Sequence, residues 1–253
     1  MSVVPEVKSR VTDEALVQRR RAQIIAAAVD LFARQGYYNT TILDVARKAG
    51  VSSGLIYQYV SDKEDVLLLA LMSVLDLYRH EIPRALEGLE DPMERWFAAV
   101  RAYCRVVHEH RVATVLAYRS TKSLPPDRRE AIKRSEIETN ALIADCLRAG
   151  VTAGLFRSVN VNVVTYQFVS FAHTWALKHW RLQDLCTLDE YVSSGLDFFA
   201  HALFTRAGWR HYRKLLASGA GVLGAPGAPP PLPSAEDAGL RRTARHPPGS
   251  PRR

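Results

Sequence analysis

The sequence predicts an all-α protein, and three features of its 253 residues carry that prediction. Apolar residues recur at helical spacing along almost the whole chain, and no segment keeps the two-residue alternation that marks a strand. Cap residues mark helix starts, such as Asp91 before Pro92 and Asn160 before a long apolar run. Glycines and prolines separate the periodic segments. We therefore expect about nine helices and no sheet.

These start and stop signals set the bounds of the expected helices. The spacing of Ser61 to Glu64 and of Thr187 to Glu190 predicts a capping box at each place. Pro83 is the predicted stop of the fourth helix, because proline disrupts a helix interior. The helices are expected near residues 13–35, 42–49, 53–60, 62–81, 92–110, 112–122, 126–150, 161–181 and 188–216.

Composition indicates a chain with a sizeable core and a basic surface. Hydrophobic residues make up 47% of the sequence, enough to bury an extended core. The formal net charge of +8 favours a polyanionic partner, although many basic proteins bind no nucleic acid. Cys104, Cys146 and Cys186 are odd in number and lack paired spacing. Neither a disulfide framework nor a metal site is therefore expected.

The sequence has no segment typical of targeting or membrane insertion. Residues 1–14 carry charges where a signal peptide would need an apolar stretch. The most apolar run, residues 66–75, is about half as long as a membrane span. We therefore expect a soluble protein of the cytoplasm with no membrane partner.

Composition and pattern divide the chain into four parts. From residue 218 onward Gly, Pro and Ala dominate, and a segment with so few large apolar residues cannot offset its ordering entropy. The four expected parts are a flexible arm at 1–12, a three-helix domain at 13–63, a larger helical domain at 64–217 and a disordered tail at 218–253.

Basic residues near the N-terminus have two interpretations. Lys8, Arg10 and the arginine run 19–21 either reach toward a polyanion, with an arm in a DNA minor groove, or form a solvated face beside Asp13 and Glu14. The sequence does not decide between them.

Residues 19–63 have the pattern of a helix-turn-helix. Gly50 ends the second helix, and a tight turn through Val51 leads into the third. Two short helices joined by a turn with Gly and packed on a longer helix form this arrangement. The alternative is a three-helix corner of a larger helical protein. The residues expected to face inward are Ile24, Ala28, Leu31, Phe32, Ile42, Val45, Ala46, Ala49, Ile56 and Val60.

The start of the third helix is suited to DNA. Ser52, Ser53 and Gly54 lie at its N-terminus, the part of a recognition helix that approaches base edges in the major groove. Serine hydroxyls and free backbone N–H groups there suit phosphate oxygens, and the helix dipole favours the contact.

The rest of the same surface adds five candidates. Tyr57 can donate its hydroxyl to a phosphate, and Gln58 can pair with adenine. Leu55 can touch a thymine methyl if it faces outward. Thr41 and Lys63 flank the motif and are expected to contact the DNA backbone.

This stretch resembles the TetR family of bacterial transcription regulators. The family's pattern is matched by Gly36-Tyr37, Thr41, the run Ser52-Ser53-Gly54-Leu55-Ile56-Tyr57, and Lys63. The resemblance implies a ligand-responsive repressor that binds a palindromic operator through its N-terminal domain. It also implies a homodimer, joined through the helices expected at 161–181 and 188–216.

The expected effector is a hydrophobic small molecule, and no other cofactor is implied. Residues 113–156 are similar to the branch of the family that responds to acyl-CoA esters. Arg119, Lys122, Arg128, Arg129 or Lys133 would then meet the CoA phosphates. The candidate cavity walls, which equally suit a plain core, are Trp96, Tyr103, Val107, Leu116, Tyr118 and Phe168.

Other functions have less support. The sequence contains no Gly-rich phosphate loop, no G-x-S-x-G elbow and no HExxH helix, so no enzyme is expected. His173 and His179 lie among aromatic residues and suit hydrogen-bonded core or interface positions. The alternatives are a TetR-like regulator of efflux or aromatic catabolism that senses a drug or aromatic ligand, and a helical interaction module without specific DNA binding.

Overall fold

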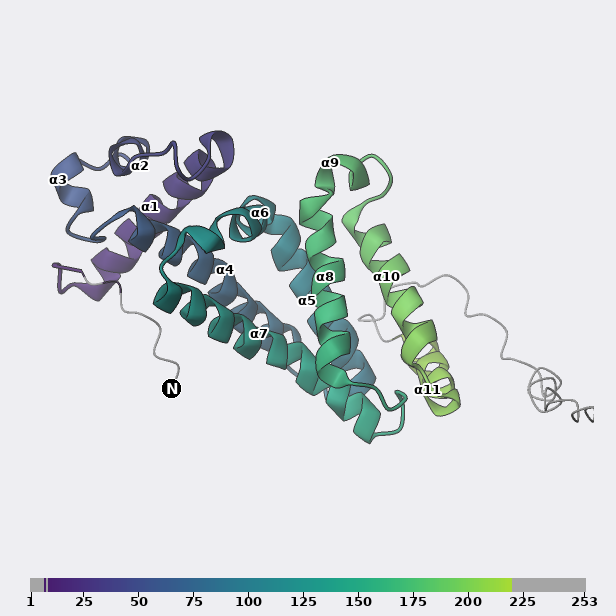
Figure 1. Cartoon of the computed structure of the whole chain (residues 1–253). Helices are drawn as coiled ribbons and strands as arrows, with labels where there is room; N and C mark the ends of the chain where they lie inside the picture. Colours follow the sequence, from purple (N-terminus) through teal and green to yellow (C-terminus); the bar gives the residue numbers. More distant parts are fainter. Residues whose placement is uncertain (1–6, 8, 220–253) are drawn as a thin grey trace, which may run out of the picture.

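The computed structural model describes residue 7 and residues 9–219, and this part of the chain is helical (Figure 1). Residues 1–6 and 8 of the expected arm at 1–12, and residues 220–253 of the expected tail at 218–253, lie outside the described residues. The only bridge among the described residues joins Phe156 and Phe204. The elements are α1 (Glu14–Gln35), α2 (Ile42–Lys48), α3 (Ser53–Ile56), α4 (Lys63–Ala85), α5 (Pro92–Glu109), α6 (Arg111–Ser120), the 3-10 helix η1 (Thr121–Ser123), α7 (Pro126–Thr152), α8 (Val161–Leu177), α9 (His179–Leu182), α10 (Leu188–Leu203) and α11 (Arg206–Ala217).

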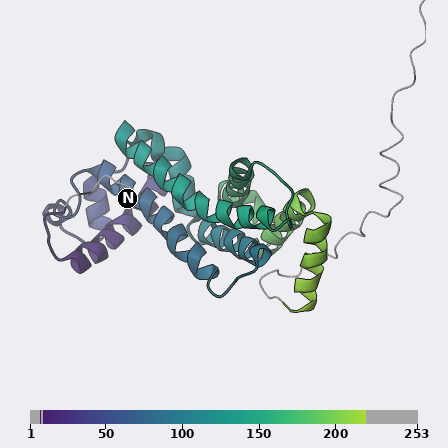
Figure 2. The ribbon, with the colours of Figure 1, turned by 90° about the horizontal axis from the view of Figure 1, so that it is seen from below.

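Helices α1 to α3 form a small N-terminal head at one end of the molecule, and α10 and α11 lie at the other end (Figures 1 and 2). Seven of the ten inward residues expected from the sequence are buried in the head's core: Ile24, Ala28, Phe32, Val45, Ala46, Ile56 and Val60. Tyr59 joins them, with its side chain buried against the same cluster. The other three expected residues, Leu31, Ile42 and Ala49, are partly buried against it.

Helix α4 connects the head to the larger unit. It contacts α1 on one side and α5, α6 and α7 on the other. The predicted stop at Pro83 is wrong, because the helix continues to Ala85. Pro83 lies in the last turn, where the missing N–H removes only one backbone hydrogen bond. The Leu86 N–H closes the end of the helix on the Ile82 and Pro83 carbonyls.

Two of the expected helices are each divided in two. The stretch 161–181 breaks at Lys178, and a short α9 follows. The stretch 188–216 breaks after Leu203, where Phe204 is extended and Thr205 caps α11. Segment 154–157 causes the second break: Leu203 accepts a hydrogen bond from the Arg157 N–H, and Thr205 donates one to the Leu155 carbonyl. These long-range bonds leave no trace in local periodicity.

Most helix starts were predicted correctly, and one capping box was not. Asp91 caps α5, and Thr187 and Glu190 form the expected reciprocal cap of α10. At the start of α4 the cap is Asp62, which accepts the Asp65 N–H, in place of the expected Ser61–Glu64 box. Among the described residues no helix is long and apolar enough to cross a membrane.

Candidate functional site

The first turn of α3 is presented to solvent. Ser52 caps it, with its side chain accepting the Leu55 N–H at 3.2 Å. Gly50 reaches the required turn geometry with a φ of 68°, a conformation that costs glycine little. Ser53 and Gly54 are exposed, whereas Leu55 is partly buried against the core. The predicted contact of Leu55 with a thymine methyl therefore has only part of that side chain available.

The recognition helix is shorter than the predicted 53–60. After Ile56 the chain continues in tight turns, because the N–H groups of Gln58 and Tyr59 bond to carbonyls three residues back. Tyr57 and Gln58 are nevertheless exposed on these turns, as expected. Tyr57 is 43% exposed, which leaves its hydroxyl end available to a partner.

Thr41 and Lys63 already have partners within the head. The Thr41 side chain accepts the Asp44 N–H, and its hydroxyl lies 2.6 Å from the Asp44 carboxylate. The Lys63 ammonium donates to the carbonyls of Tyr37 and Thr40, each at 2.9 Å, and lies over the Tyr37 ring. Each of these residues thus stabilises the loop between α1 and α2.

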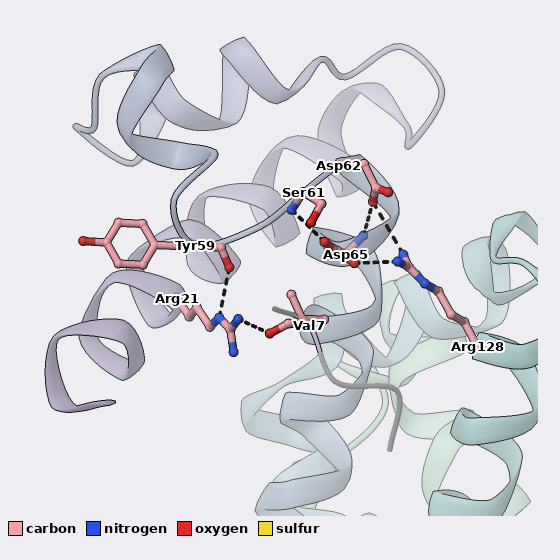
Figure 3. Close-up of polar contacts among 7 residues, drawn as sticks. All are labelled: Val7, Arg21, Tyr59, Ser61, Asp62, Asp65 and Arg128. Atoms are coloured by element: carbon pink, nitrogen blue, oxygen red, sulfur yellow. Dashed lines mark hydrogen bonds and ion pairs between the residues drawn. The ribbon is translucent and has the colours of Figure 1, made fainter. Parts of the chain in front are cut away.

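Val7 and Arg10 are hydrogen-bonded to residues at the end of the helix-turn-helix or in α1 (Figure 3). The Arg10 N–H donates to the Gln58 carbonyl at 2.8 Å. Arg21 of α1 donates to the carbonyls of Tyr59 and Val7, so it joins Val7 to the end of the helix-turn-helix. At least one member of the basic run 19–21 therefore has an internal role.

An ion pair joins the start of α4 to the start of α7. Arg128 of α7 lies 2.6 Å from the Asp65 carboxylate and 3.5 Å from that of Asp62 (Figure 3). Asp65 is buried, and it also accepts the Ser61 N–H at 2.7 Å. The expected role of Arg128 at a CoA phosphate is therefore hard to reconcile with its place, because this guanidinium is occupied by two carboxylates.

A cavity of about 290 Å³ lies among α4, α5, α6, α7 and α8. Its wall is mostly apolar, with two of the predicted residues, Tyr103 and Tyr118, among the polar groups. His173 lies between them: its Nε2 is 3.0 Å from the Tyr103 hydroxyl, and its Nδ1 is 2.9 Å from that of Tyr118. The other polar residues of the lining are Tyr78, Thr114, Thr121, Lys133 and Glu136.

The state of His173 decides what this cavity can offer a ligand. Burial lowers the pKa of His173 to about 4, so the imidazole is neutral at pH 7. A neutral imidazole has one N–H and one acceptor nitrogen. One tyrosine hydroxyl therefore donates to the ring and the other accepts from it. The accepting hydroxyl keeps its own hydrogen for a further acceptor.

Burial also acts on the carboxyl group in the cavity. It raises the pKa of Glu136 above its ordinary value. The same cause, and secondarily the nearby Glu136 charge, raises the pKa of Tyr118. The cavity therefore disfavours charge and favours neutral, hydrogen-bonding partners.

The other predicted effector residues lie elsewhere. Trp96, Val107 and Phe168 are fully enclosed in the core, where Trp96 meets Phe168 edge to face. None of the three lines the cavity. Leu116 and Arg119 line a separate groove on the other side of α6. Lys122 is exposed on η1 and lines neither space.

Five polar residues of the cavity were not among the predicted effector residues: Tyr78, Thr114, Thr121, Glu136 and His173. His173 was expected only as a hydrogen-bonded core or interface residue, and Tyr78 and Glu136 were not selected. Charged residues surround Tyr78 and Glu136 in the sequence, so local composition gives no signal that either lines a cavity. The spacing of residues along one helix does not predict which helices pack against one another.

Comparison with known proteins decides the family. The model for "Bacterial regulatory proteins, tetR family" matches residues 24–70, and that for "Tetracyclin repressor-like, C-terminal domain" matches residues 89–180. The HTH-type transcriptional regulator HbdR of Aromatoleum sp. (strain CIB) is 55% identical over 82% of this chain and 91% of its own length. The chain belongs to the TetR family. It is therefore a DNA-binding transcriptional regulator, as the sequence predicted.

More distant members of the family share the fold. The transcriptional repressor KstR2 of Mycolicibacterium smegmatis is 28% identical over 64% of this chain and 78% of its own length. The structure of the ketosteroid transcriptional regulator KstR2 of Mycobacterium tuberculosis has a TM-score of 0.62 and 21% identity, and covers 79% of this chain and 100% of its own. A putative regulator from Saccharomonospora viridis in complex with choline has a TM-score of 0.64 and 22% identity, and covers 75% and 100%.

The buried imidazole predicts a pH dependence of stability. Between pH 6.5 and about 4 the unfolded chain binds a proton at His173 that the folded chain does not bind. The free energy of unfolding should therefore fall as the pH is lowered through this window. His173→Asn should flatten that fall, which urea unfolding at a series of pH values would measure.

His108 and His179, whose pKa values burial also lowers, supply part of the same slope, so the difference between variant and wild type is the quantity to compare. Tyr118→Phe keeps the imidazole and serves as the control. Parallel pH profiles for wild type and His173→Asn would contradict the prediction.

Proposed function

We propose that the protein is a repressor whose dimer holds a palindromic operator until a compact, mostly apolar effector enters the cavity between α4 and α8. The observation that supports the effector part of this proposal is the hydrogen-bonded set Tyr103–His173–Tyr118, which lies in a cavity whose wall is mostly apolar. Ligand sites of small molecules have this composition.

On the DNA side, two kinds of contact are proposed. Ser52, Ser53 and Gly54 bring the N-terminus of α3 to the groove edge, where backbone N–H groups meet phosphate. Tyr57 anchors a phosphate, and Gln58 reads a base. Thr41 and Lys63 are proposed to act on the DNA backbone through the loop that they stabilise as well as by direct contact.

Dimerisation is proposed through α8 and α10. Several large apolar side chains are exposed on these helices and on the segment between them, which is unusual for a monomer surface. Two recognition helices held at a fixed spacing match a palindromic operator. The exposed residues are Val163, Tyr166, Leu177, Trp180, Leu185 and Phe198.

The effector proposed first is an acyl-CoA ester with a small acyl group. A cavity of about 290 Å³ is at the lower limit of typical ligand sites, which span about 300–1,000 Å³. Short or ring-shaped acyl groups suit this volume better than long chains. The remaining tyrosine hydrogen suits the thioester carbonyl. Lys133, which lines the cavity and pairs with Glu130 at 2.6 Å, would offer its other N–H groups to the CoA part.

A second candidate effector is a compact aromatic compound without CoA. The stacked rings of Tyr78 and Tyr103, with centroids 4.1 Å apart, give the cavity a flat aromatic wall. Aromatic ligands pack well on such a wall. In this case the target genes would serve efflux or aromatic catabolism.

Substitutions in α3 should separate the two kinds of DNA contact. Tyr57→Ala should weaken operator binding about fivefold on every sequence, because a neutral hydrogen bond to phosphate contributes about 1 kcal/mol. Gln58→Ala should chiefly relax base preference, by about 1–3 kcal/mol at one position. Fluorescence anisotropy on the operator and on single-base variants would measure both.

Thr152→Ala, at an exposed position at the end of α7, lies outside the head and the proposed dimer face; it is the control and should change neither quantity. Lys63→Ala should weaken binding on all sequences and also lower the melting temperature, because it removes the ammonium from the Tyr37 and Thr40 carbonyls. Equal loss of base preference in all three binding variants would overturn this division of roles.

A charge at the proposed dimer face should separate the subunits. Phe198→Asp places an unpaired carboxylate on a side chain that is 69% exposed in the single chain, so folding should be unaffected. Light scattering should then report a monomer, and operator affinity should fall. Ile137→Asp, at an exposed position of α7, is the control and should stay dimeric. If the wild type were monomeric at micromolar concentration, the dimer proposal would be contradicted.

The size of the acyl group should decide effector activity. We expect acetyl-CoA or benzoyl-CoA to release the operator complex at lower concentration than hexadecanoyl-CoA, because the cavity excludes a long chain. Electrophoretic mobility shift with each thioester would measure this. Tyr118→Phe should raise the concentration required, since one tyrosine hydroxyl is lost from the His173 pair.

Benzoate and free CoA are the controls. Release by benzoate at the same concentration as by benzoyl-CoA would favour the aromatic candidate. If neither any thioester nor any aromatic acid released the operator, the effector proposal would be dropped, whereas the DNA-binding assignment would stand.

A further inference from the structure

A second and larger space contains Arg119, which the sequence offered as one candidate for the CoA phosphates. It is a groove of about 690 Å³ between the N-terminal head and the larger unit formed by α4 to α11, here called the regulatory domain. Its walls are the end of α1 and the following turn on one side, and α6, η1 and the α8–α9 corner on the other. Helix α6 separates it from the effector cavity: Arg119 lines the groove, while the adjacent Tyr118 lines the cavity.

The charged side chains of the groove are all potential cations. Arg34, Arg111 and Arg119 line it, and no Asp or Glu does. Arg34 pairs with Asp30 outside the lining, and Arg111 donates to the His108 carbonyl. Arg119 makes no hydrogen bond or ion pair with any described residue. An arginine fork without a carboxylate partner is suited to phosphate or carboxylate groups of a ligand.

Planar rings stand beside these cations. Tyr37 and Tyr38 come from the turn after α1, and His179 from α9. Tyr38 is 75% exposed, yet its hydroxyl accepts a hydrogen bond from Ser123 Oγ at 2.9 Å, which holds the ring at the edge of the groove. Small and apolar side chains from α1, α6 and α8 form the remaining floor. A flat ring can stack here while an anionic group meets Arg119.

We propose that this groove is a second ligand site, for a nucleotide-sized anion that carries a planar ring. The volume lies in the middle of the range for small-molecule sites, and the charge and the rings select the same chemistry. A molecule bound here contacts both α1 and α6, so it holds the head to the regulatory domain. The site is distinct from the effector cavity and does not depend on the effector's identity.

Calorimetric titration of the full-length protein with ADP tests the proposal. We expect saturable binding to the wild type in the high-micromolar range or tighter, and weaker binding of adenosine and of inorganic phosphate, because each supplies only half of the contacts. Arg119→Gln should weaken ADP binding about tenfold, the usual loss for a charged hydrogen bond to phosphate. Lys122→Gln removes an equal charge from η1, outside the groove, and should leave ADP binding unchanged.

Each alternative result is distinct. No heat with ADP up to millimolar concentration would overturn the proposal, and so would equal weakening by Arg119→Gln and Lys122→Gln, which would indicate only general attraction to a basic protein. If phosphate bound as strongly as ADP, the proposed stacking of a planar ring would be contradicted, and the groove would be an anion site only. Thermal melting of each variant without ligand checks that the fold is kept. No change is expected for Arg119→Gln, because Arg119 has no hydrogen-bond or ion-pair partner among the described residues.

Discussion

The arrangement of the two domains depends on the contacts that the buried Asp65 carboxylate makes with Arg128 and with the Ser61 N–H. Asp65 lies in the first turn of α4, and its partners come from both sides: the Ser61 N–H belongs to the end of the head, and Arg128 begins α7. Breaking a buried ion pair by removing one partner costs about 3–5 kcal/mol, because the other charge is left without compensation. The pair therefore fixes where α4 starts relative to α7, and with it the orientation of α3 on the regulatory domain.

The head was predictable because its determinants are local. A cap, a glycine turn and apolar residues three or four apart define each short helix, and the buried set of Ile24, Val45 and Ile56 agrees with that pattern. In the C-terminal half, the predicted helix ends were wrong where contacts with distant segments determine them. Helix α10 ends at Leu203 because segment 154–157 takes up its carbonyl and the Thr205 N–H. Apolar spacing runs through this break without interruption, so periodicity alone predicts one long helix.

The cavity was only partly predictable for a related reason. Spacing shows that Trp96, Tyr103 and Phe168 face inward, and all three are buried. Spacing does not show whether an inward side chain contacts another side chain or borders an unfilled space. The same residue types occur in the filled core and in the cavity wall. Trp96 is surrounded by aromatic rings, whereas Tyr103 borders a gap that α6 and α7 leave open. The polar residues of the gap, His173 above all, distinguish the two environments more clearly than the apolar ones.

Helix α6 lies between the proposed effector cavity and the groove. One of its faces supplies Thr114, Ala117 and Tyr118 to the effector cavity, and the other supplies Arg111, Val115 and Arg119 to the groove beside α1. The helix also begins without a side-chain cap, at His110, and η1 follows it directly. A helix that is held mainly by packing can shift as a unit when one side is filled. Because α6 contacts α1, such a shift changes the wall against which the head rests. We therefore propose α6 as the helix that couples the proposed effector cavity to the operator-binding head; a ligand in the groove would oppose or assist the same movement from the other side.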